Sequence, residues 1–154
     1  MIILYKPQLK ELWFRQKMLA DEETMSYNHA WGGVIPFPED KWEDWYSYWV
    51  SEPEGERFYR YVKNEDGAFV GEIAYHFDCE LGGYIANVII FSAYRRRGYG
   101  GQALDALCKA AKENGVASLY DDIAADNPAA ELFYKRGFIE VGRTAEKIIL
   151  KKEL

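Results

Sequence analysis

Cysteine is scarce in this sequence. Cys79 and Cys108 are the only two among 154 residues, they lie far apart, and no C-x-x-C pair or Cys/His cluster accompanies them. A disulfide framework or a zinc site needs closely grouped ligands, so neither is expected and no metal is predicted. Two reduced thiols are typical of a cytosolic protein.

Long hydrophobic runs and targeting segments are also missing. No stretch approaches the roughly 20 apolar residues that cross a bilayer, and the first residues show no basic start followed by a long apolar run. We therefore expect a cytoplasmic protein with no membrane partner. Repeats, low-complexity tracts and Pro/Gly/Ser-rich linkers are lacking too, which predicts one domain over residues 1–154.

Positive charge is in deficit. The chain has 25 acidic and 19 basic residues and a net charge of -6. A negative net charge disfavours a nucleic-acid partner and is compatible with a cationic amine as substrate. Aromatic residues, in contrast, make up 16% of the chain and are concentrated in its first half. They build either a core or a binding pocket, and composition does not distinguish the two.

Segments rich in strand formers alternate with segments of helical periodicity. Strands are predicted at residues 2–5, 58–63, 68–77, 84–91, 118–124, 138–143 and 147–151, and helices after Pro7, after Asp40, from Gly98 and from Asn127. The unbroken apolar run at residues 88–91 indicates a central strand covered on both faces. This order implies an α/β protein in which a mixed sheet is flanked by helices.

Residues 21–38 show no sustained periodicity, and a loop of this length in a compact domain is often functional. The helix that follows is predicted to begin with a capping box formed by Asp40 and Glu43. Its aromatic stripe includes Trp42 and Trp45, for which core packing is the expected role and a pocket wall the alternative.

A glycine- and arginine-rich segment, residues 95–101, joins the predicted central strand to the next helix. The first N–H groups of a helix lack intrahelical partners, and the helix dipole adds partial positive charge there. Glycines allow an anion close to the backbone, and arginines add charge-assisted donors. The segment therefore predicts a pyrophosphate cradle.

Two other interpretations of this segment compete with the cradle. Flexible RNA-binding segments also combine arginine and glycine, but they are repetitive, and this one is fixed between a strand and a helix of an acidic protein. Glycines that merely form a turn, with solvated arginines, stay an alternative. A P-loop Lys-Ser/Thr and a GxGxxG after the first strand are both missing, which disfavours a dinucleotide or a nucleoside triphosphate.

Two motifs resemble the GNAT superfamily of acyl-CoA N-acetyltransferases. Arg95, Gly98 and Gly100 match that family's R/Q-x-x-G-x-G/A pattern. Residues 126–138 resemble its later motif of Asn, Ala, Tyr seven residues after Asn, and Gly-Phe, although two residues rather than three separate Tyr134 from Gly-Phe. The resemblance implies that family's mixed, mostly antiparallel, twisted sheet flanked by helices.

The resemblance also implies acetyl-CoA as the cosubstrate, with no metal. The residues it assigns to coenzyme A are Val88, Ile89 and Ile90 for the pantetheine arm; Arg95, Arg96, Arg97, Gly98, Tyr99, Gly100 and Gly101 for the pyrophosphate; and Asn127, with Tyr134, near the pantetheine and thiol. A free strand N–H would also stabilise the oxyanion of the tetrahedral intermediate. That requires a splayed neighbouring strand, since a fully paired strand has no N–H to offer. Capping a helix is a sufficient alternative role for Asn127.

The catalytic candidates are Tyr134, Asp121 and Glu72. Tyr134 would protonate the leaving thiolate, with packing on the inner face of its helix as the alternative. Asp121 alternates with apolar neighbours and so places a carboxylate on a face expected to be apolar, and Glu72 is a second candidate base. A structural role for either carboxylate, or a chain of water molecules acting as the base, stays open.

The acceptor-binding candidates are Tyr27, His29 and Trp31 in the long loop, although surface exposure is the simpler expectation for His29. No Ser-His-Asp or Cys-His arrangement is visible, which favours direct attack by a primary amine in a ternary complex over an acyl-enzyme. The acceptor itself is open. The alternative function is a coenzyme A-binding module without turnover, and a homodimer is left open.

Overall fold

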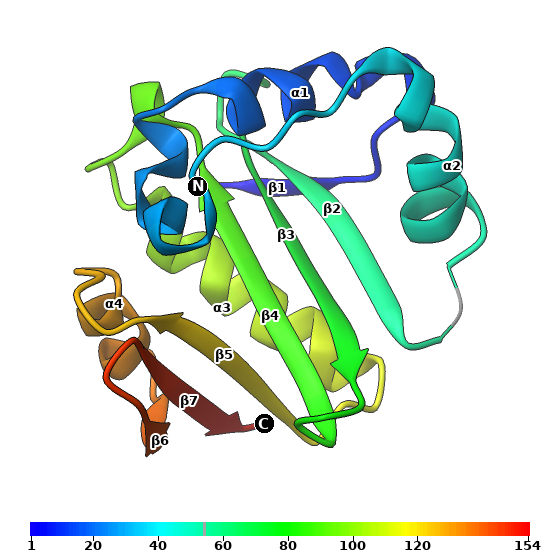
Figure 1. Ribbon diagram of the computed structural model, residues 1–154. Helices are drawn as coiled ribbons and strands as arrows, with labels where there is room; N and C mark the ends of the chain where they lie inside the picture. Colours follow the sequence, from blue (N-terminus) through cyan, green and yellow to red (C-terminus); the bar gives the residue numbers. More distant parts are fainter. Residues whose placement is uncertain (54) are drawn as a thin grey trace.

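The computed structural model describes residues 1–53 and 55–154 as a seven-stranded sheet with helices on both faces (Figure 1). The strands are β1 (Ile3–Tyr5), β2 (Arg57–Lys63), β3 (Phe69–Asp78), β4 (Gly83–Ile90), β5 (Ser118–Ala124), β6 (Ile139–Arg143) and β7 (Lys147–Glu153). Their order across the sheet is β1-β2-β3-β4-β5-β7-β6. The β4–β5 pair is parallel and the other neighbouring pairs are antiparallel. The predicted mixed, mostly antiparallel sheet is confirmed.

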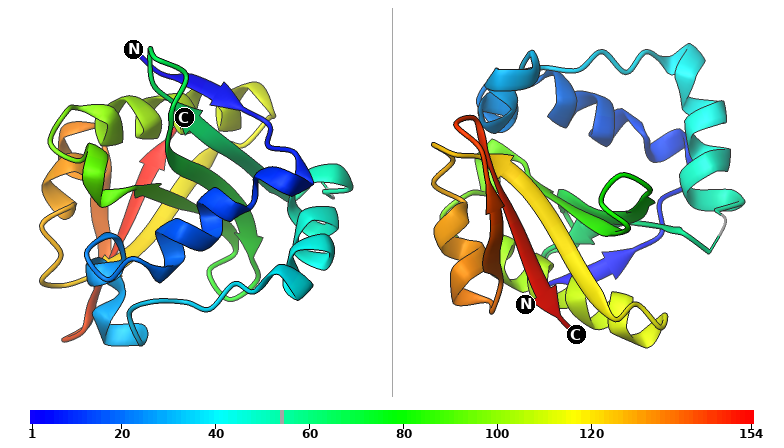
Figure 2. Two further views of the ribbon diagram at one scale, coloured as in Figure 1. Left: turned by 90° about the horizontal axis from the view of Figure 1, so that it is seen from above. Right: turned by 60° about the horizontal axis from the view of Figure 1, so that its bottom comes forward.

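Two groups of helices enclose the sheet (Figure 2). The helical elements are η1 (Leu9–Glu11), α1 (Trp13–Ala20), η2 (Thr24–Trp31), η3 (Glu39–Lys41), α2 (Trp42–Tyr46), η4 (Ser47–Ser51), η5 (Ser92–Tyr94), α3 (Tyr99–Glu113) and α4 (Ala130–Lys135). The apolar side chains of α3 pack on one face of the sheet, together with Phe133 of α4. α1 and the aromatic residues of α2 and η4 cover the other face. No helix in the described part of the chain is both long and apolar enough to cross a membrane.

Three local predictions need correction. Residues 21–38 contain the ordered 3-10 helix η2 rather than a loop throughout. The Asp40 capping box does not form, because η3 begins at Glu39, after Pro38, without a side-chain cap. Asn127 does not cap α4; its side-chain oxygen accepts the Ala129 N–H at 2.9 Å in a turn before the helix, which begins at Ala130.

The sheet is split between β4 and β5. Pairing of these strands is confined to Tyr84 with Leu119 and Ile85 with Tyr120, at their N-terminal ends. Beyond these pairs the two strands diverge, as Figure 1 shows. A splayed neighbour is the condition that β4 needs to offer free main-chain groups.

Candidate active site

The gap beside β4 exposes main-chain groups of this strand. The Phe91 N–H donates to the Val70 oxygen at 2.8 Å. Because hydrogen bonding alternates along an antiparallel pair, the odd-numbered residues of β4 bond to β3. The N–H and C=O groups of Val88 and Ile90 therefore face the gap. Ile89 directs its peptide groups to β3; it is buried in the cluster on the α1 side and is among the residues that line the cavity.

The N-terminus of α3 lies at the open end of this gap. Gly98 precedes the helix in the left-handed conformation, at φ +83°, and the Gln102 N–H makes the first helical bond, to the Gly98 oxygen. The N–H groups of residues 99–101 consequently lack partners within the helix. A Cβ on Gly100 would lie 3.3 Å from Leu132 of α4. These donors stand at the positive end of a 15-residue helix, which suits an anion.

Arg95 is occupied by the protein itself. Its Nε donates to the Ile90 oxygen at 3.2 Å, Nη1 to the Glu23 oxygen at 3.0 Å and Nη2 to the Thr24 oxygen at 2.6 Å. The side chain thus links the start of η2 to the end of β4. These bonds use three of the five N–H bonds of the guanidinium, and the predicted contact of Arg95 with the pyrophosphate stays a prediction.

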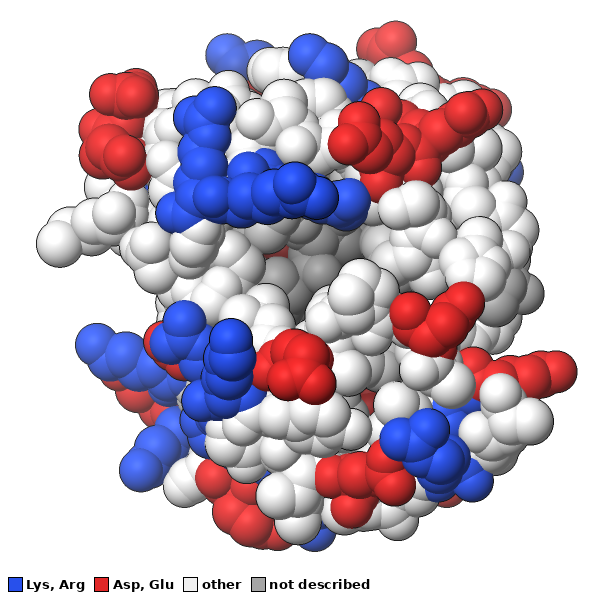
Figure 3. Space-filling model, turned by 90° about the vertical axis from the view of Figure 1, so that its left-hand side faces the viewer, with Lys and Arg blue, Asp and Glu red and all other residues white. Residues whose placement is uncertain are grey.

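The other residues of the segment differ in what they offer. Arg96 lines the cavity, whereas Arg97 lies over the Tyr94 ring at 5.7 Å and is not part of the lining. Tyr99 buries its ring in the core, so its N–H is the group available to a ligand. Figure 3 shows a hollow on this side of the molecule with basic side chains along one rim.

The structure places Tyr134 outside the cleft. Its side chain is 37% exposed and does not line the cavity, whose wall is formed here by Leu132 and Phe133. Phe133 packs against Phe138, the last residue of the motif, with ring centroids 5.0 Å apart. Phe133, and not Tyr134, is thus the buried residue at the cavity, and phenylalanine has no proton to give. The predicted position of Tyr134 is thereby corrected.

One cavity of about 1010 Å³ joins the two faces of the sheet through the gap. On the α3 side it is lined by residues of the β4 end, the α3 N-terminus and the start of α4, including Asn127. On the other side it is lined by Arg15, Tyr27, His29, Trp31, Ile35, Trp45, Trp49, Tyr59, Glu72, Ala74, His76 and Asn87. A ligand bound at the α3 end can therefore meet a second ligand that enters under α2 and η4.

The sequence model of the Acetyltransferase (GNAT) family matches residues 15–138. This chain belongs to the GNAT family. No curated protein sequence matches it. The spermidine N-acetyltransferase of Vibrio cholerae, solved with CoA and spermine, is 17% identical, with a TM-score of 0.81 over 99% of this chain and 95% of the other. A GNAT-family acetyltransferase of Bacillus anthracis is 17% identical, with a TM-score of 0.77 over 99% and 94%. A domain from Methanocaldococcus jannaschii is 15% identical, with a TM-score of 0.78 over 100% and 99%. At these identities the similarity shows the shared fold.

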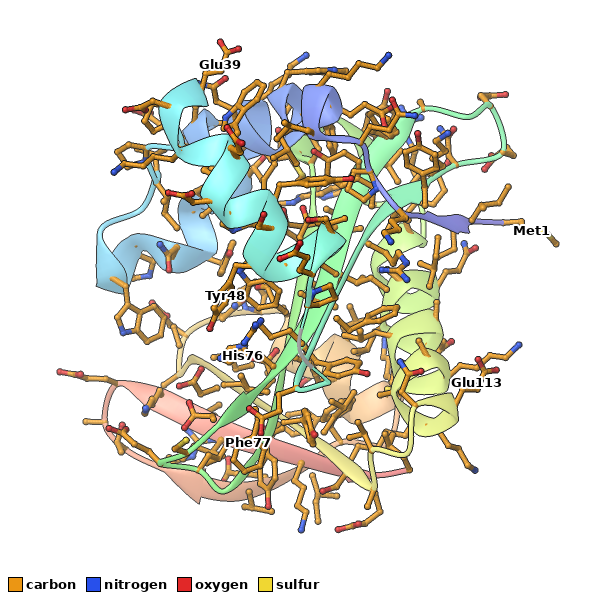
Figure 4. The ribbon with its side chains drawn as sticks, turned by 90° about the vertical axis from the view of Figure 1, so that its right-hand side faces the viewer. Met1, Glu39, Tyr48, His76, Phe77 and Glu113 are labelled. Carbon is orange, nitrogen blue, oxygen red and sulfur yellow. The ribbon has the colours of Figure 1, made fainter. Side chains whose placement is uncertain are left out.

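Tyr27, His29 and Trp31 of this GNAT protein all line the cavity, where η2 approaches β5. His29 remains 61% exposed and its Nε2 lies 3.4 Å from the Asp126 carboxylate. Sequence reasoning did not assign Trp45 to the cavity wall, because a helical aromatic stripe is the same whether it faces a core or a pocket. It also missed Trp49, whose ring packs edge-on against His76 at 5.8 Å. Figure 4 shows His76 beneath the α2–η4 segment that carries Tyr48.

Glu72 lies in a buried polar cluster on the acceptor side. Its side chain is 1% exposed; Oε1 accepts the Tyr59 hydroxyl at 2.7 Å and Oε2 accepts the Asn87 amide at 3.2 Å. The Arg15 Nε lies 3.2 Å from Oε1. Both oxygens of the Glu72 carboxylate are thus engaged by neighbouring side chains of the protein. This environment favours a structural role for Glu72.

Asp121 has a different environment. It lines the cavity between Leu119 and Ile123, both of which belong to the core under α3. Burial, with a smaller contribution from neighbouring Asp122, raises the pKa of the Asp121 carboxyl well above its usual range. Burial also raises the pKa of the Tyr27 hydroxyl and lowers that of the His76 imidazole. A carboxyl with a raised pKa in a cleft is suited to proton exchange at neutral pH.

Proposed function

We propose that this GNAT protein transfers an acetyl group from acetyl-CoA to a small primary amine by direct attack. The supporting observation is the cavity that joins the α3 N-terminus to the aromatic face through the split sheet. Such a cavity allows a thioester and an amine to meet at β4 from opposite faces. The Vibrio spermidine N-acetyltransferase, which was solved with CoA and spermine, is in line with a donor side and an acceptor side.

On the donor side, main-chain groups would do most of the binding. The Val88 and Ile90 edge would pair with the pantetheine arm as an added strand. The N–H groups of residues 98–101, with Arg96, would hold the pyrophosphate. Asn127 borders the same space. Acetyl-CoA supplies the activated acetyl group, and the Val88 N–H would stabilise negative charge on its carbonyl oxygen.

On the acceptor side, Asp121 would accept the proton that the amine loses on attack. The amine nitrogen forms the new C–N bond as the C–S bond breaks, and the electron pair leaves on sulfur. A thiol with a pKa near 8.5 departs readily as the anion, so an enzyme donor is not essential. Glu72 would hold Arg15 and Asn87 in place rather than take the proton.

An acyl-enzyme is disfavoured by the placement of the two thiols. Cys108 is buried in α3, Cys79 is exposed after β3, and neither lines the cavity. Burial also raises the pKa of the Cys108 thiol, which lowers its thiolate content. The cytoplasmic location and the homodimer stay predictions.

The test is acetyl-CoA-dependent thiol release with a panel of primary amines, combined with calorimetry of coenzyme A binding. Gly100→Glu should abolish both, because a carboxylate would occupy the anion's place in a protein that still folds. Gly55→Glu is the matched control, since a Cβ there meets nothing within 4 Å and the site is exposed. If folded Gly100→Glu binds coenzyme A with unchanged affinity, the α3 N-terminus is not the pyrophosphate site. Coenzyme A binding without thiol release for any amine would favour the non-catalytic binding module.

A further inference from the structure

Arg15 carries an unused binding edge on the acceptor side of the cavity. The guanidinium lies over the rings of Phe37 and Trp45, with its carbon 4.7 and 4.3 Å from their centroids. Its side chain is 16% exposed and lines the cavity. A cation held by aromatic faces and largely withdrawn from water binds anions more strongly than a solvated one.

Glu72 forms an ion pair with the inner edge of this guanidinium. The carboxylate also receives Tyr59 and Asn87, so its two oxygens are already engaged. Its contact with Arg15 is through Nε, at 3.2 Å, and is an ion pair without hydrogen-bond alignment. Within residues 1–53 and 55–154, the four N–H bonds on Nη1 and Nη2 have no hydrogen-bond acceptor. That outer edge has the geometry that accepts a planar carboxylate in two parallel bonds.

The acidic groups of the cavity offer less to a polycation. Glu72 is paired with Arg15, Asp122 lies 3.3 Å from the Lys147 ammonium, and Asp126 lies beside His29. Asp121 is the remaining carboxyl of the described lining, and the proposed mechanism uses it as the proton acceptor. Among the described residues, the acceptor side therefore offers no group of unpaired carboxylates for several ammonium groups and provides a cationic fork beside an aromatic wall.

We propose that the acceptor is an α-amino acid with an apolar or aromatic side chain, acetylated on its α-amine. Its carboxylate binds the outer edge of Arg15, and its side chain lies against Trp45 and Trp49. This inference rests on the proposed acetyltransferase activity and names the substrate class of the same site.

The register of the strands agrees with this placement. Glu72 lies opposite Ile89 in the β3–β4 register, one residue from Val88. Arg15 contacts Glu72, and both Arg15 and Val88 line the same cavity. The amine and the carboxylate of an α-amino acid are attached to one carbon, so a compact acceptor would direct its carboxylate to Arg15 and its amine to β4.

The experiment compares matched acceptors that differ by the carboxylate, L-phenylalanine with phenethylamine, and adds spermidine as a polyamine. In thiol-release kinetics we expect L-phenylalanine to have a kcat/KM about 10- to 100-fold higher than that of phenethylamine. This ratio corresponds to the binding free energy of one charge-assisted pair between the carboxylate and Arg15. Arg15→Lys keeps the charge and removes the fork, so it should erase most of that advantage through KM and leave phenethylamine nearly unchanged. Arg15→Met/Glu72→Gln removes both charges together and should have the same effect if Arg15→Lys proves unstable.

The outcomes separate this inference from the function on which it rests. Acetylation of phenethylamine or spermidine with no preference for the carboxylate would overturn the amino-acid assignment. The proposed acetyltransferase activity would still stand. If no amine releases thiol, binding of L-phenylalanine and phenethylamine to the coenzyme A complex is measured by calorimetry. Tighter binding of L-phenylalanine that depends on Arg15 would then support the carboxylate site, and equal binding would overturn it.

Discussion

At the scale of single residues, two carboxyl groups in one cavity show how surroundings set chemistry. Glu72 is surrounded by donors, and Asp121 lies between apolar neighbours of the core. Because burial raises the pKa of Asp121, its proton is held to a higher pH than in an exposed aspartate. The same environment that makes this group a useful proton acceptor destabilises the folded chain once the carboxyl ionises.

Asp121→Asn should lower kcat at neutral pH by about 100-fold or more, the usual range for loss of a general base. A base acts in its deprotonated form, so wild-type activity should fall as pH drops through the raised pKa of Asp121. The pH profiles of wild type and Asp121→Asn are compared with one amine, so that the amine's own titration cancels. An identical acidic limb in both proteins would exclude Asp121 as the base.

The same substitution should stabilise the fold above the ordinary aspartate pKa near 3.8. Below that pH the carboxyl is protonated in both folded and unfolded chains and contributes no difference. Above it the unfolded chain loses the proton first, so wild type loses about 1.4 kcal/mol per pH unit up to the folded pKa. Thermal unfolding of Asp121→Asn and wild type should therefore diverge as pH rises. Asp66→Asn, on an exposed turn, is the control for the substitution itself.

At the scale of elements, η2 is held in place by a polar junction. The Asp21 carboxylate accepts the Thr24 N–H at 3.0 Å and the Ser92 hydroxyl at 2.6 Å, and these bonds lower its pKa. The Ser92 N–H donates to the Thr24 hydroxyl at 2.9 Å. Arg95 adds its three bonds to the same junction, so the segment that carries Tyr27 and Trp31 is fixed to the end of β4.

Arg95→Ala should therefore weaken acceptor binding more than coenzyme A binding. Loss of hydrogen bonds from a charged donor costs roughly 1.5–3 kcal/mol each when they are well formed, so we expect at least a tenfold rise in the amine's KM. Calorimetry of coenzyme A binding tests the other half of the expectation. Arg143→Ala, which removes an equivalent guanidinium from an exposed pair with Glu140, is the control. If Arg95→Ala instead lowers coenzyme A affinity alone, Arg95 contributes to pyrophosphate binding and not to acceptor binding.

Periodicity predicted the elements better than their ends. β5 was predicted with its observed bounds, because Ser118–Ala124 lies between a glycine stop and a turn. α4 begins later than Asn127 suggested, because an Asn can hydrogen-bond a nearby N–H in a turn as well as at a helix cap. The motif also predicted Tyr134 in the cleft, where the structure has Phe133. Successive side chains of a helix differ in direction by about a quarter turn, so a shift of one residue along the chain exchanges their positions.

At the scale of the whole molecule, the sequence predicted the order of the elements and the position of the glycine- and arginine-rich segment before α3. The split between β4 and β5 was expected only as a requirement of coenzyme A binding, since non-local pairing leaves no periodic signal in a strand. Arg15 and Glu72 come together from α1 and β3, and Trp45 joins them from α2. Contacts between such distant segments depend on packing, and for this reason the sequence did not reveal the unused edge of Arg15.

The last prediction concerns the division of the molecule into donor and acceptor sides. Trp31 is 53% exposed, lines the cavity from η2 and lies on the side away from α3. An aromatic wall holds the apolar part of an amine, so Trp31→Ala should raise the acceptor's KM about tenfold, or ~1.4 kcal/mol, and leave coenzyme A affinity unchanged. Trp13→Ala is the matched control, because Trp13 is 48% exposed on α1 and contacts Phe14 and Phe69 outside the cavity. Reduced coenzyme A affinity with unaltered acceptor kinetics in Trp31→Ala would place η2 on the donor side, and the proposed division would be wrong.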